Sequence, residues 1–396
     1  MNEIEIIICL LLLFMSVPDL CGSVGRPALA YPVFVVSGLL LAPFAEPAVH
    51  NMLVEAGHVG FLLLLFEVGL EIELPRLRVF ARPLARAFFW SLVQYPLVFA
   101  LAYVLAGLRP VGCFIACAAF TGCSVGMGYP GWKNYPGLAP DRRRQILLMM
   151  LALEIFSIVL LSVETTLYQS GVRWVLVAQL AGIVAVVGFI GWFSRHLKTL
   201  FGHILKRTTH WRVHLIVLLV LVVCAIGQRL GLSAIKTAFF LGLFLSRITH
   251  EGRRLEHFIA PISRRFLIPI FFFALGLQIP REFLFSPPGL GAFAAAAAVL
   301  LLRWGLHRFV FSIGGDRRAF LLLCPNLTIA ALAAGTLLHE GTSARAASWV
   351  LLTGLFITIP SIFLLPGQKE DEGAPGLPRP NRPASRSHPP SEGESM

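Results

Sequence analysis

Residues 64–76 read LLFEVGLEIELPR, and residues 271–283 read FFFALGLQIPREF. Aligning Gly69 with Gly276 gives one pattern, F-x-x-G-L-[E or Q]-I, in both stretches. A single short match is weak evidence, because glycine and leucine are abundant throughout this chain. A repeat is indicated only if the surrounding sequence matches as well.

The helices that precede these two stretches match in the same way. SGLLL at 37–41 aligns with LGLFL at 241–245 through Gly38 and Gly242, at nearly the same spacing along the chain. Two successive matches in the same order indicate an internal repeat, with one copy in each half of the sequence.

The composition places both copies in a membrane. Of the 396 residues, 57% are hydrophobic and 14% are charged, whereas a soluble domain carries about 25% charged residues. Long apolar runs recur from end to end, so the expected fold class is an all-α polytopic membrane protein. A window of about 20 residues predicts thirteen transmembrane helices. Their centres lie near residues 11, 37, 63, 97, 118, 155, 182, 220, 239, 270, 300, 328 and 355.

The basic residues test this number of helices. Most of the 33 Lys and Arg residues fall in alternate loops and in the C-terminal tail. The other loops hold five of them: Arg109, Arg173, Arg229, Arg281 and Arg345. By the positive-inside rule the N-terminus is outside and the C-terminus is cytoplasmic, in a bacterial-type inner membrane. A missing or extra helix would break the alternation.

The two copies of the repeat are expected to cross the membrane in opposite directions, because the matching helices are an odd number of spans apart. Inverted repeats are typical of secondary transporters, whose substrate sites lie near the midplane. We expect a transmembrane domain at 1–365, built from repeat one (1–168), a linker helix (172–193) and repeat two (210–365). The tail at 366–396 is rich in Pro, Ser, Gly and charge, and it is expected to be disordered.

Several other classes of protein are disfavoured. The formal charge of +12 is spread over short basic clusters between apolar spans, so nucleic acid is not an expected partner. The seven cysteines form no C-x-x-C pair, so neither a metal site nor a disulfide framework is expected. The N-terminal segment starts with acidic residues and lacks a cleavage pattern, which favours a retained first helix over a signal peptide. We expect no catalytic residues and no cofactor.

A glutamate lies in the middle of the sixth predicted helix, where residues 149–161 read MMLALEIFSIVLL. A charge at a helix centre costs about 2.5–3.5 kcal/mol, so it faces protein or a water-filled cavity. Glu154 is either part of a structural ion pair or the site at which a cation and a proton compete. A carboxylate suits the second role, because its anion binds a hard monovalent cation and its neutral form does not.

Two further places in the spans carry charge. Arg303 lies deep in AAAAAVLLLRWGLHRF at 294–309, and because arginine keeps its proton we expect it to be a charge partner, with Glu154 opposite. Glu67 and Glu71 share one face of the third helix. They are either acids at the inner mouth that extend toward water, or a second proton or ion relay.

Two stretches are predicted to be broken helices. AAFTGCSVGMGYPGWKN at 118–134 and CPNLTIAALAAG at 324–335 place Gly, Pro and polar residues within apolar spans. Unwound segments in transporters expose carbonyl groups and helix ends that coordinate ions, although Gly and Pro are also tolerated in ordinary transmembrane packing. Candidate ion-coordinating residues are Thr121, Cys123, Ser124, Asn326 and Thr328.

The chain resembles the monovalent cation:proton antiporter superfamily, in particular the cation:proton antiporter-2 type of sodium/proton exchanger. FEVGLE at 66–71, AFFLGLFLS at 238–246 and PIFFFALGLQI at 269–279 resemble its signatures in order and spacing. The resemblance implies thirteen helices, an inverted repeat, a homodimer and an elevator motion. It also implies a core domain (helices four to six and eleven to thirteen) that slides against a dimerisation domain (helices one to three and eight to ten).

The resemblance places the ion-binding acid of helix six at Glu154 and the basic residue of helix eleven at Arg303. The family generally has Asp where this chain has Glu154, and the residue before it is Leu153, where well-known sodium exchangers have Asp or Asn. One carboxylate beside a non-titrating arginine predicts one-for-one, electroneutral exchange. The apolar side chain of Leu153 is also consistent with a site that binds a different ion, or with a protein that has lost transport.

Three hypotheses follow. The first is an electroneutral Na⁺/H⁺ or K⁺/H⁺ antiporter with an elevator mechanism. The second is a sodium-coupled symporter of an organic anion on the same architecture. The third is a non-transporting sensor or scaffold derived from the antiporter fold.

Overall fold

The computed structural model describes the chain in segments. These are residues 3–44, 46–71, 77–125, 127–128, 139–170, 212–229, 234–246, 249–250, 253–255, 258–259, 263–310, 324–339 and 344–364. The predicted linker helix at 172–193 and the tail at 366–396 lie outside these residues.

The described elements are almost all helical. The first half of the chain forms α1 (Glu3–Ser23), η1 (Pro27–Leu29), α2 (Ala30–Leu41), η2 (Ala42–Phe44), α3 (Pro47–Glu71), α4 (Leu77–Ala106), α5 (Pro110–Thr121) and α7 (Pro140–Ser170). The second half forms α9 (Arg212–Arg229), α10 (Ala234–Leu245), β1 (Thr249–His250), β2 (Arg253–Arg254), η3 (Ser263–Leu267), α12 (Ile268–Leu277), α13 (Arg281–Leu284), α14 (Pro287–Phe309), α16 (Leu327–His339) and α17 (Ala344–Leu364).

The predicted all-α fold class is confirmed. Every predicted helix centre except the one near residue 182 falls within a described helix. The sequence did not predict the short antiparallel pairing of β1 with β2, which joins Thr249 to Arg254.

Six described segments are long and apolar enough to cross a membrane: Pro27–Phe44, Pro47–Leu70, Ala81–Ala106, Pro140–Leu161, Pro287–Phe309 and Ala344–Leu364. Shorter apolar helices lie at Ile8–Ser23, Pro110–Thr121, His214–Arg229, Arg265–Leu277 and Leu327–Leu338. The short helix at Pro110–Thr121 stops where the sequence predicts a break.

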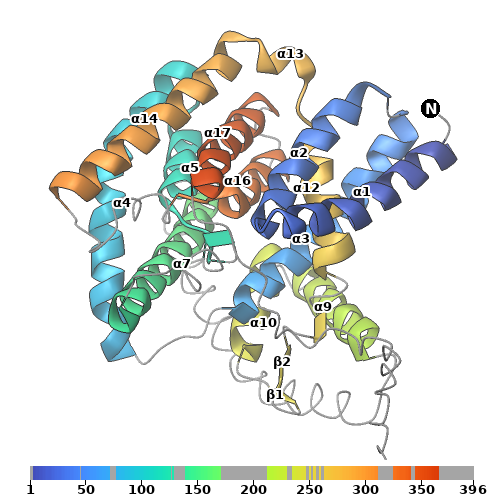
Figure 1. Ribbon diagram of the computed structural model, residues 1–396, viewed down its shortest axis with the longest axis horizontal. Helices are drawn as coiled ribbons and strands as arrows, with labels where there is room; N and C mark the ends of the chain where they lie inside the picture. The colour runs from blue at the N-terminus through green and yellow to red at the C-terminus, as the bar shows by residue number, and fades with distance from the viewer. Residues whose placement is uncertain are drawn as a thin grey trace, which may run out of the picture.

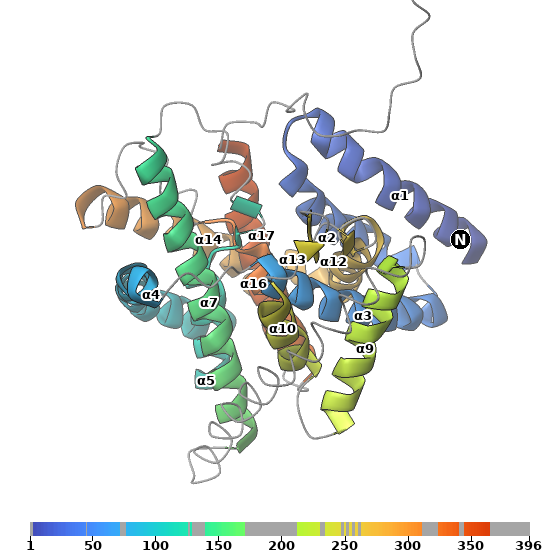
Figure 2. The same ribbon diagram turned by 90° about the horizontal axis from the view of Figure 1, so that it is seen from below.

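The helices pack as two groups that lie side by side (Figures 1 and 2). In the first group, α4, α5, α7, α14, α16 and α17 pack against one another. In the second group, α3 packs on α9, α10 and α12, and α2 packs on α1 and α12. This division follows the two sets of helices that the family resemblance implies. We call them the core group and the scaffold group.

Glycines allow the scaffold helices to cross at close range. Gly38 of α2 and Gly276 of α12 each face backbone of the other helix, and a Cβ atom at either would collide with a carbonyl oxygen there. Gly69 of α3 and Gly242 of α10 cross in the same way. The aligned glycines therefore occupy equivalent places at two crossings, each of which joins one predicted repeat to the other. A residue-by-residue inverted repeat remains a prediction.

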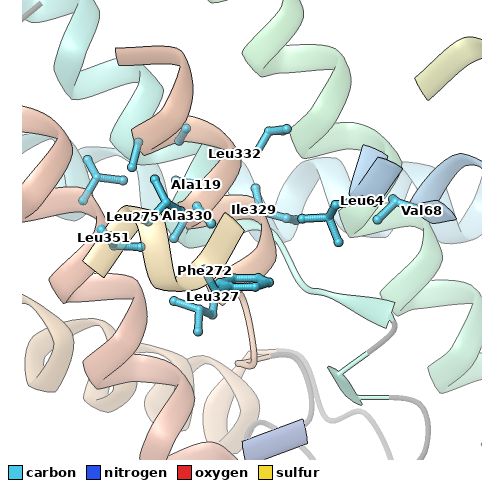
Figure 3. Close-up of a cluster of buried hydrophobic side chains, with 14 of the residues drawn as sticks. Leu64, Val68, Ala119, Phe272, Leu275, Leu327, Ile329, Ala330, Leu332 and Leu351 are labelled. Atoms are coloured by element: carbon cyan, nitrogen blue, oxygen red, sulfur yellow. The ribbon is translucent and has the colours of Figure 1, made fainter. Parts of the chain in front are cut away.

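Apolar side chains fill the boundary between the two groups. Leu64 of α3 lies beside Ile329 of α16, and Phe272 of α12 lies beside Leu327 of α16 (Figure 3). All four side chains are buried. A boundary of this kind has few directional contacts that would fix one position of the groups relative to each other.

Candidate functional site

The two predicted broken stretches meet inside the core group. Helix α5 ends at Thr121 and the chain continues in extended form through residues 122–124, with φ −72° and ψ 169° at Gly122. Residues 324–326 are likewise non-helical before α16 begins. The Ser124 amide donates a 2.7 Å hydrogen bond to the Pro325 carbonyl, so the two unwound segments touch through their backbones.

Hydroxyl groups accompany this backbone contact. Ser124 Oγ lies 3.0 Å from Thr328 Oγ1, to which it donates a hydrogen bond. Thr121 Oγ1 donates to the Cys117 carbonyl over 2.9 Å. A hydroxyl that donates its proton retains oxygen lone pairs. The structure thus places the hydroxyl groups of Thr121, Ser124 and Thr328 at or beside the two unwound segments.

Asn326 connects three helices at the point where the two unwound segments meet, which we call the crossing. Its Nδ2 donates to the carbonyl groups of Ala119, at 3.2 Å, and Phe120, at 3.5 Å. Its backbone amide donates to Thr358 Oγ1 over 3.2 Å, and that hydroxyl lies 3.4 Å from Asn326 Oδ1. The amide side chain therefore joins the end of α5 to α17, and its fixed contacts favour a role in holding the crossing.

Arg303 is held at the same end of α5. The buried face of α14 carries small residues at Ala292, Ala295, Ala296 and Val299 before Arg303, which lets the helix approach its neighbours closely. Arg303 Nε donates to Gln94 Oε1 over 2.9 Å, and Nη2 donates to the Phe120 carbonyl. The guanidinium has no exposed surface. Its positive charge lies at the C-terminal end of α5, where it interacts favourably with the negative end of the helix dipole.

Glu154 reaches the crossing from α7. Ile146, Met150, Glu154, Ser157 and Leu161 are buried and recur at helical spacing along one face, so the carboxylate side of α7 packs inward. The Glu154 side chain is 1% exposed. Both α5 and α16 pack on this helix, which places Glu154 in the core group at the level of the unwound segments.

Electrostatic contacts join these residues into one site. The Cys123 thiol, in the first unwound segment, interacts electrostatically with Glu154, Arg303 and Cys324. Cys324 is in turn hydrogen-bonded to Arg303 and Ser361. Cys123 and Cys324 are both fully buried. The direct pairing of Glu154 with Arg303 remains a prediction, whereas both charges act on the same thiol.

Glu67 belongs to the other group of helices. It is buried in α3 and accepts a 2.7 Å hydrogen bond from Ser263 Oγ, at the start of the π-helical turn η3. Glu71 is the last residue of α3, and its side chain lies outside the described residues. The inner-mouth relay of these two acids remains a prediction.

Sequence reasoning missed the polar residues that support the site. Gln94 holds Arg303, Thr358 holds Asn326, and Ser361 binds Cys324. Each is a single amide or hydroxyl in an apolar span, which gives no periodic signal. A lone glutamine in a predicted transmembrane helix is the one feature that could have been recognised, since buried amides need partners.

The arrangement suits a small, hard cation. It combines one carboxylate with hydroxyl oxygens and with carbonyl groups of unwound backbone, the oxygen ligands that such cations take. Among the residues described, no group of three or more His, Cys, Asp and Glu side chains forms a site for a resident metal ion. The oxygen ligands gathered here therefore match those of a small, hard cation.

Comparison with known proteins supports this. Residues 8–366 match the family model for the transmembrane region of sodium/hydrogen exchangers. The chain is 26% identical over 373 residues to the Bacillus subtilis (strain 168) protein named "Putative Na(+)/H(+) antiporter YjbQ"; the match covers 85% of this chain and 58% of that relative. The chain thus spans less than two thirds of that relative's length.

A solved structure shares the fold. The sodium proton antiporter MjNhaP1 from Methanocaldococcus jannaschii, solved at pH 8, is 14% identical and superposes with a TM-score of 0.64. The match covers 91% of this chain and 95% of that one. At this identity the likeness concerns the fold alone.

Proposed function

The chain belongs to the sodium/hydrogen exchanger family, and from this membership and the site we propose that it exchanges a monovalent cation, Na⁺ or K⁺, for a proton across a membrane. The observation that carries the proposal is Glu154, a carboxylate with 1% exposure on a helix that packs on α5 and α16, the helices next to the two unwound segments. A carboxylate within a span is expensive and is generally functional. Here it can hold the cation as an anion and the proton as a neutral acid.

Exchange requires that the two ions exclude each other. A single carboxylate achieves this, since protonation removes the charge that binds the cation. The preceding side chain, Leu153, is buried and apolar and adds no second titrating group. Arg303 keeps its charge throughout the cycle. One cation therefore exchanges for one proton, and the cycle is electroneutral.

The unwound segments supply the remaining ligands. Oxygens of Thr121, Ser124 and Thr328 complete the coordination shell of the cation, together with backbone carbonyl groups. Asn326 and Cys123 line the same crossing and hold its shape. This assignment is supported by the hydrogen bonds that bring the two segments together.

Alternating access follows from the two groups of helices. The core group carries the loaded site past the scaffold group in an elevator motion, and the apolar boundary between them supports sliding. The scaffold group forms a homodimer in the lipid bilayer. The protein lies in the inner membrane of a bacterial-type cell, with its N-terminus outside and its C-terminus in the cytoplasm, as its loop charges indicate.

Proteoliposomes test the proposal. Purified protein is reconstituted with a pH-sensitive dye inside, and Na⁺, K⁺ or Li⁺ is added outside under an imposed pH gradient. We expect Na⁺ or K⁺ to dissipate the gradient without generating a membrane potential. Glu154→Gln should abolish the flux, because the amide neither titrates nor carries charge, and Glu154→Asp should retain part of it.

Two outcomes would reject the proposal. If no cation dissipates the gradient, the chain is a non-transporting member of the family, and a sensor or scaffold role replaces exchange. If Na⁺ drives uptake of an organic anion without a change of internal pH, the chain is a symporter. Transport by Glu154→Gln at the wild-type rate would remove Glu154 from the mechanism.

A further inference from the structure

Ser157 is a buried hydroxyl that the proposed mechanism does not yet use. It lies one turn after Glu154 in α7 and has no exposed surface. Within the described part of the chain, its Oγ atom has no hydrogen-bond partner. A buried hydroxyl without a partner is costly, so its presence calls for an explanation.

The hydroxyl does not follow the usual habit of serine in a helix. Helical Ser and Thr side chains commonly donate to the carbonyl group four residues earlier, and several do so here: Thr121, Thr336 and Ser361. Ser157 makes no such bond to Leu153. Its oxygen is therefore available to something beyond its own helix.

The hydroxyl faces the first unwound segment. A Cβ atom placed on Gly122 would lie 2.6 Å from Ser157 Oγ and 3.0 Å from Ser157 Cβ. The backbone at Gly122 has a negative φ of −72°, which any residue adopts, so its conformation does not demand glycine. Glycine at 122 is instead explained by the close approach of Ser157 and of Ile329, whose Cδ1 atom would also lie 2.6 Å from that Cβ.

Glu154 and Ser157 converge on the same segment. Residues three apart on a helix are neighbours on one face, about 5–6 Å apart at Cβ. The Glu154 carboxylate interacts electrostatically with Cys123, the residue directly after Gly122. The Glu154 carboxylate and the Ser157 hydroxyl thus lie on one face of α7, and Ser157 approaches the first unwound segment at Gly122.

We propose that Ser157 Oγ is a direct ligand of the cation held by Glu154. The inference rests on the proposed exchange function and adds a second side chain of α7 to the binding site. The carboxylate supplies charge, and the serine oxygen, unoccupied by other bonds, supplies a short neutral contact. The proton-loaded state does not need this contact. Ser157 therefore affects the affinity for the cation and not the affinity for the proton.

The test compares apparent cation affinity in matched variants. In proteoliposomes, Ser157→Ala should raise the apparent KM for Na⁺ about tenfold, the order expected for losing one contact to a charged group, while the maximal rate stays within about twofold. Ser157→Cys keeps the size but replaces oxygen with soft sulfur, and it should raise KM similarly. Ser157→Thr keeps the hydroxyl and should remain closest to wild type.

The control is Ser91→Ala in α4. Ser91 is also fully buried, and its hydroxyl likewise has no partner among the described residues; it belongs to α4, one turn before Gln94, and not to the face of α7 that carries Glu154. Its removal should leave KM for Na⁺ unchanged. If the loss of any buried hydroxyl raised KM, both Ser157→Ala and Ser91→Ala would show the rise. That result would overturn the assignment of Ser157 as a ligand.

A binding measurement separates this inference from the exchange proposal. Na⁺ binding raises the thermal stability of detergent-solubilised protein by an amount set by the ratio of the Na⁺ concentration to Kd, whether or not the protein transports. We expect the Na⁺ concentration that produces a given rise in melting temperature to increase about tenfold in Ser157→Ala. Equal Na⁺ dependence in Ser157→Ala and wild type would refute the role of Ser157, whereas absent transport with normal Na⁺ binding would refute exchange alone.

Discussion

Glu154 and Arg303 are opposite charges in one buried site, but their surroundings differ. Arg303 is bound by two fixed oxygens, Gln94 Oε1 and the Phe120 carbonyl, so its contacts stabilise the end of α5 in one geometry. Glu154 faces the Cys123 thiol and a segment of unwound backbone. At the scale of single residues, the contacts of the arginine hold the end of α5, and we propose that the glutamate binds the transported ions.

This division of roles predicts the effect of removing the guanidinium. Arg303→Met keeps the apolar stem of the side chain but removes the donor to Gln94 Oε1, and it leaves the Phe120 carbonyl with only the 3.5 Å contact from Asn326 Nδ2. Loss of a buried charged donor costs about 2–5 kcal/mol, so we expect a clear fall in the melting temperature of the purified protein. The control is Arg308→Met, at the exposed end of the same helix, which should melt like wild type. Equal melting temperatures in both variants would show that the Arg303 contacts are dispensable.

At the scale of elements, sequence reasoning succeeded where a pattern spans many residues. Apolar runs and loop charges gave the helices, and glycines with polar residues at 118–134 and 324–335 marked the breaks at the crossing. It missed Gln94 and Ser157, because a single polar residue does not reveal which neighbouring helix it faces. The pairing of Arg303 with Glu154 stays a prediction, beside the bonds from Nε and Nη2 to neutral oxygens.

Helix crossings provide a prediction at this scale. Gly276 of α12 lies against backbone of α2, so Gly276→Ala would force the two helices apart. Gly305 of α14 has open space around it, and Gly305→Ala should be neutral or slightly stabilising through helix propensity, by up to about 1 kcal/mol. Melting temperatures of the two variants in detergent measure the difference. A Gly276→Ala protein as stable as Gly305→Ala would contradict the close crossing.

At the scale of the whole molecule, the proposed transport cycle depends on the two groups of helices. The core group carries Glu154 and the crossing, while the scaffold group presents the apolar faces of α3 and α12 to it (Figure 3). The sequence predicted these sets of helices only through the family resemblance. Packing between helices distant in the sequence leaves no periodic pattern, so composition and spacing alone could not assign α4 or α14 to one group.

A cross-link between the groups should stop an elevator. Leu64 and Ile329 lie side by side across the boundary (Figure 3), and we expect a disulfide between Leu64→Cys and Ile329→Cys to block cation-driven proton flux until it is reduced. Cysteines at Leu105 and Gly291 form the matched control, because both positions belong to the core group and their Cβ atoms would lie 3.1 Å apart. Variants that carry only one of the two introduced cysteines show whether that cysteine forms a disulfide with a native cysteine. Unimpaired flux in the Leu64–Ile329 disulfide would contradict relative movement of the groups.

The central claim is that one carboxylate holds either the cation or the proton. Its most direct test is the apparent KM for Na⁺, or for K⁺ if that is the ion transported, measured in proteoliposomes over a range of pH. Competition with one proton predicts that KM rises about tenfold for each unit by which pH falls on the acid side, while the maximal rate at saturating cation stays constant. A KM independent of pH, with only the maximal rate changing, would mean that the two ions do not share Glu154.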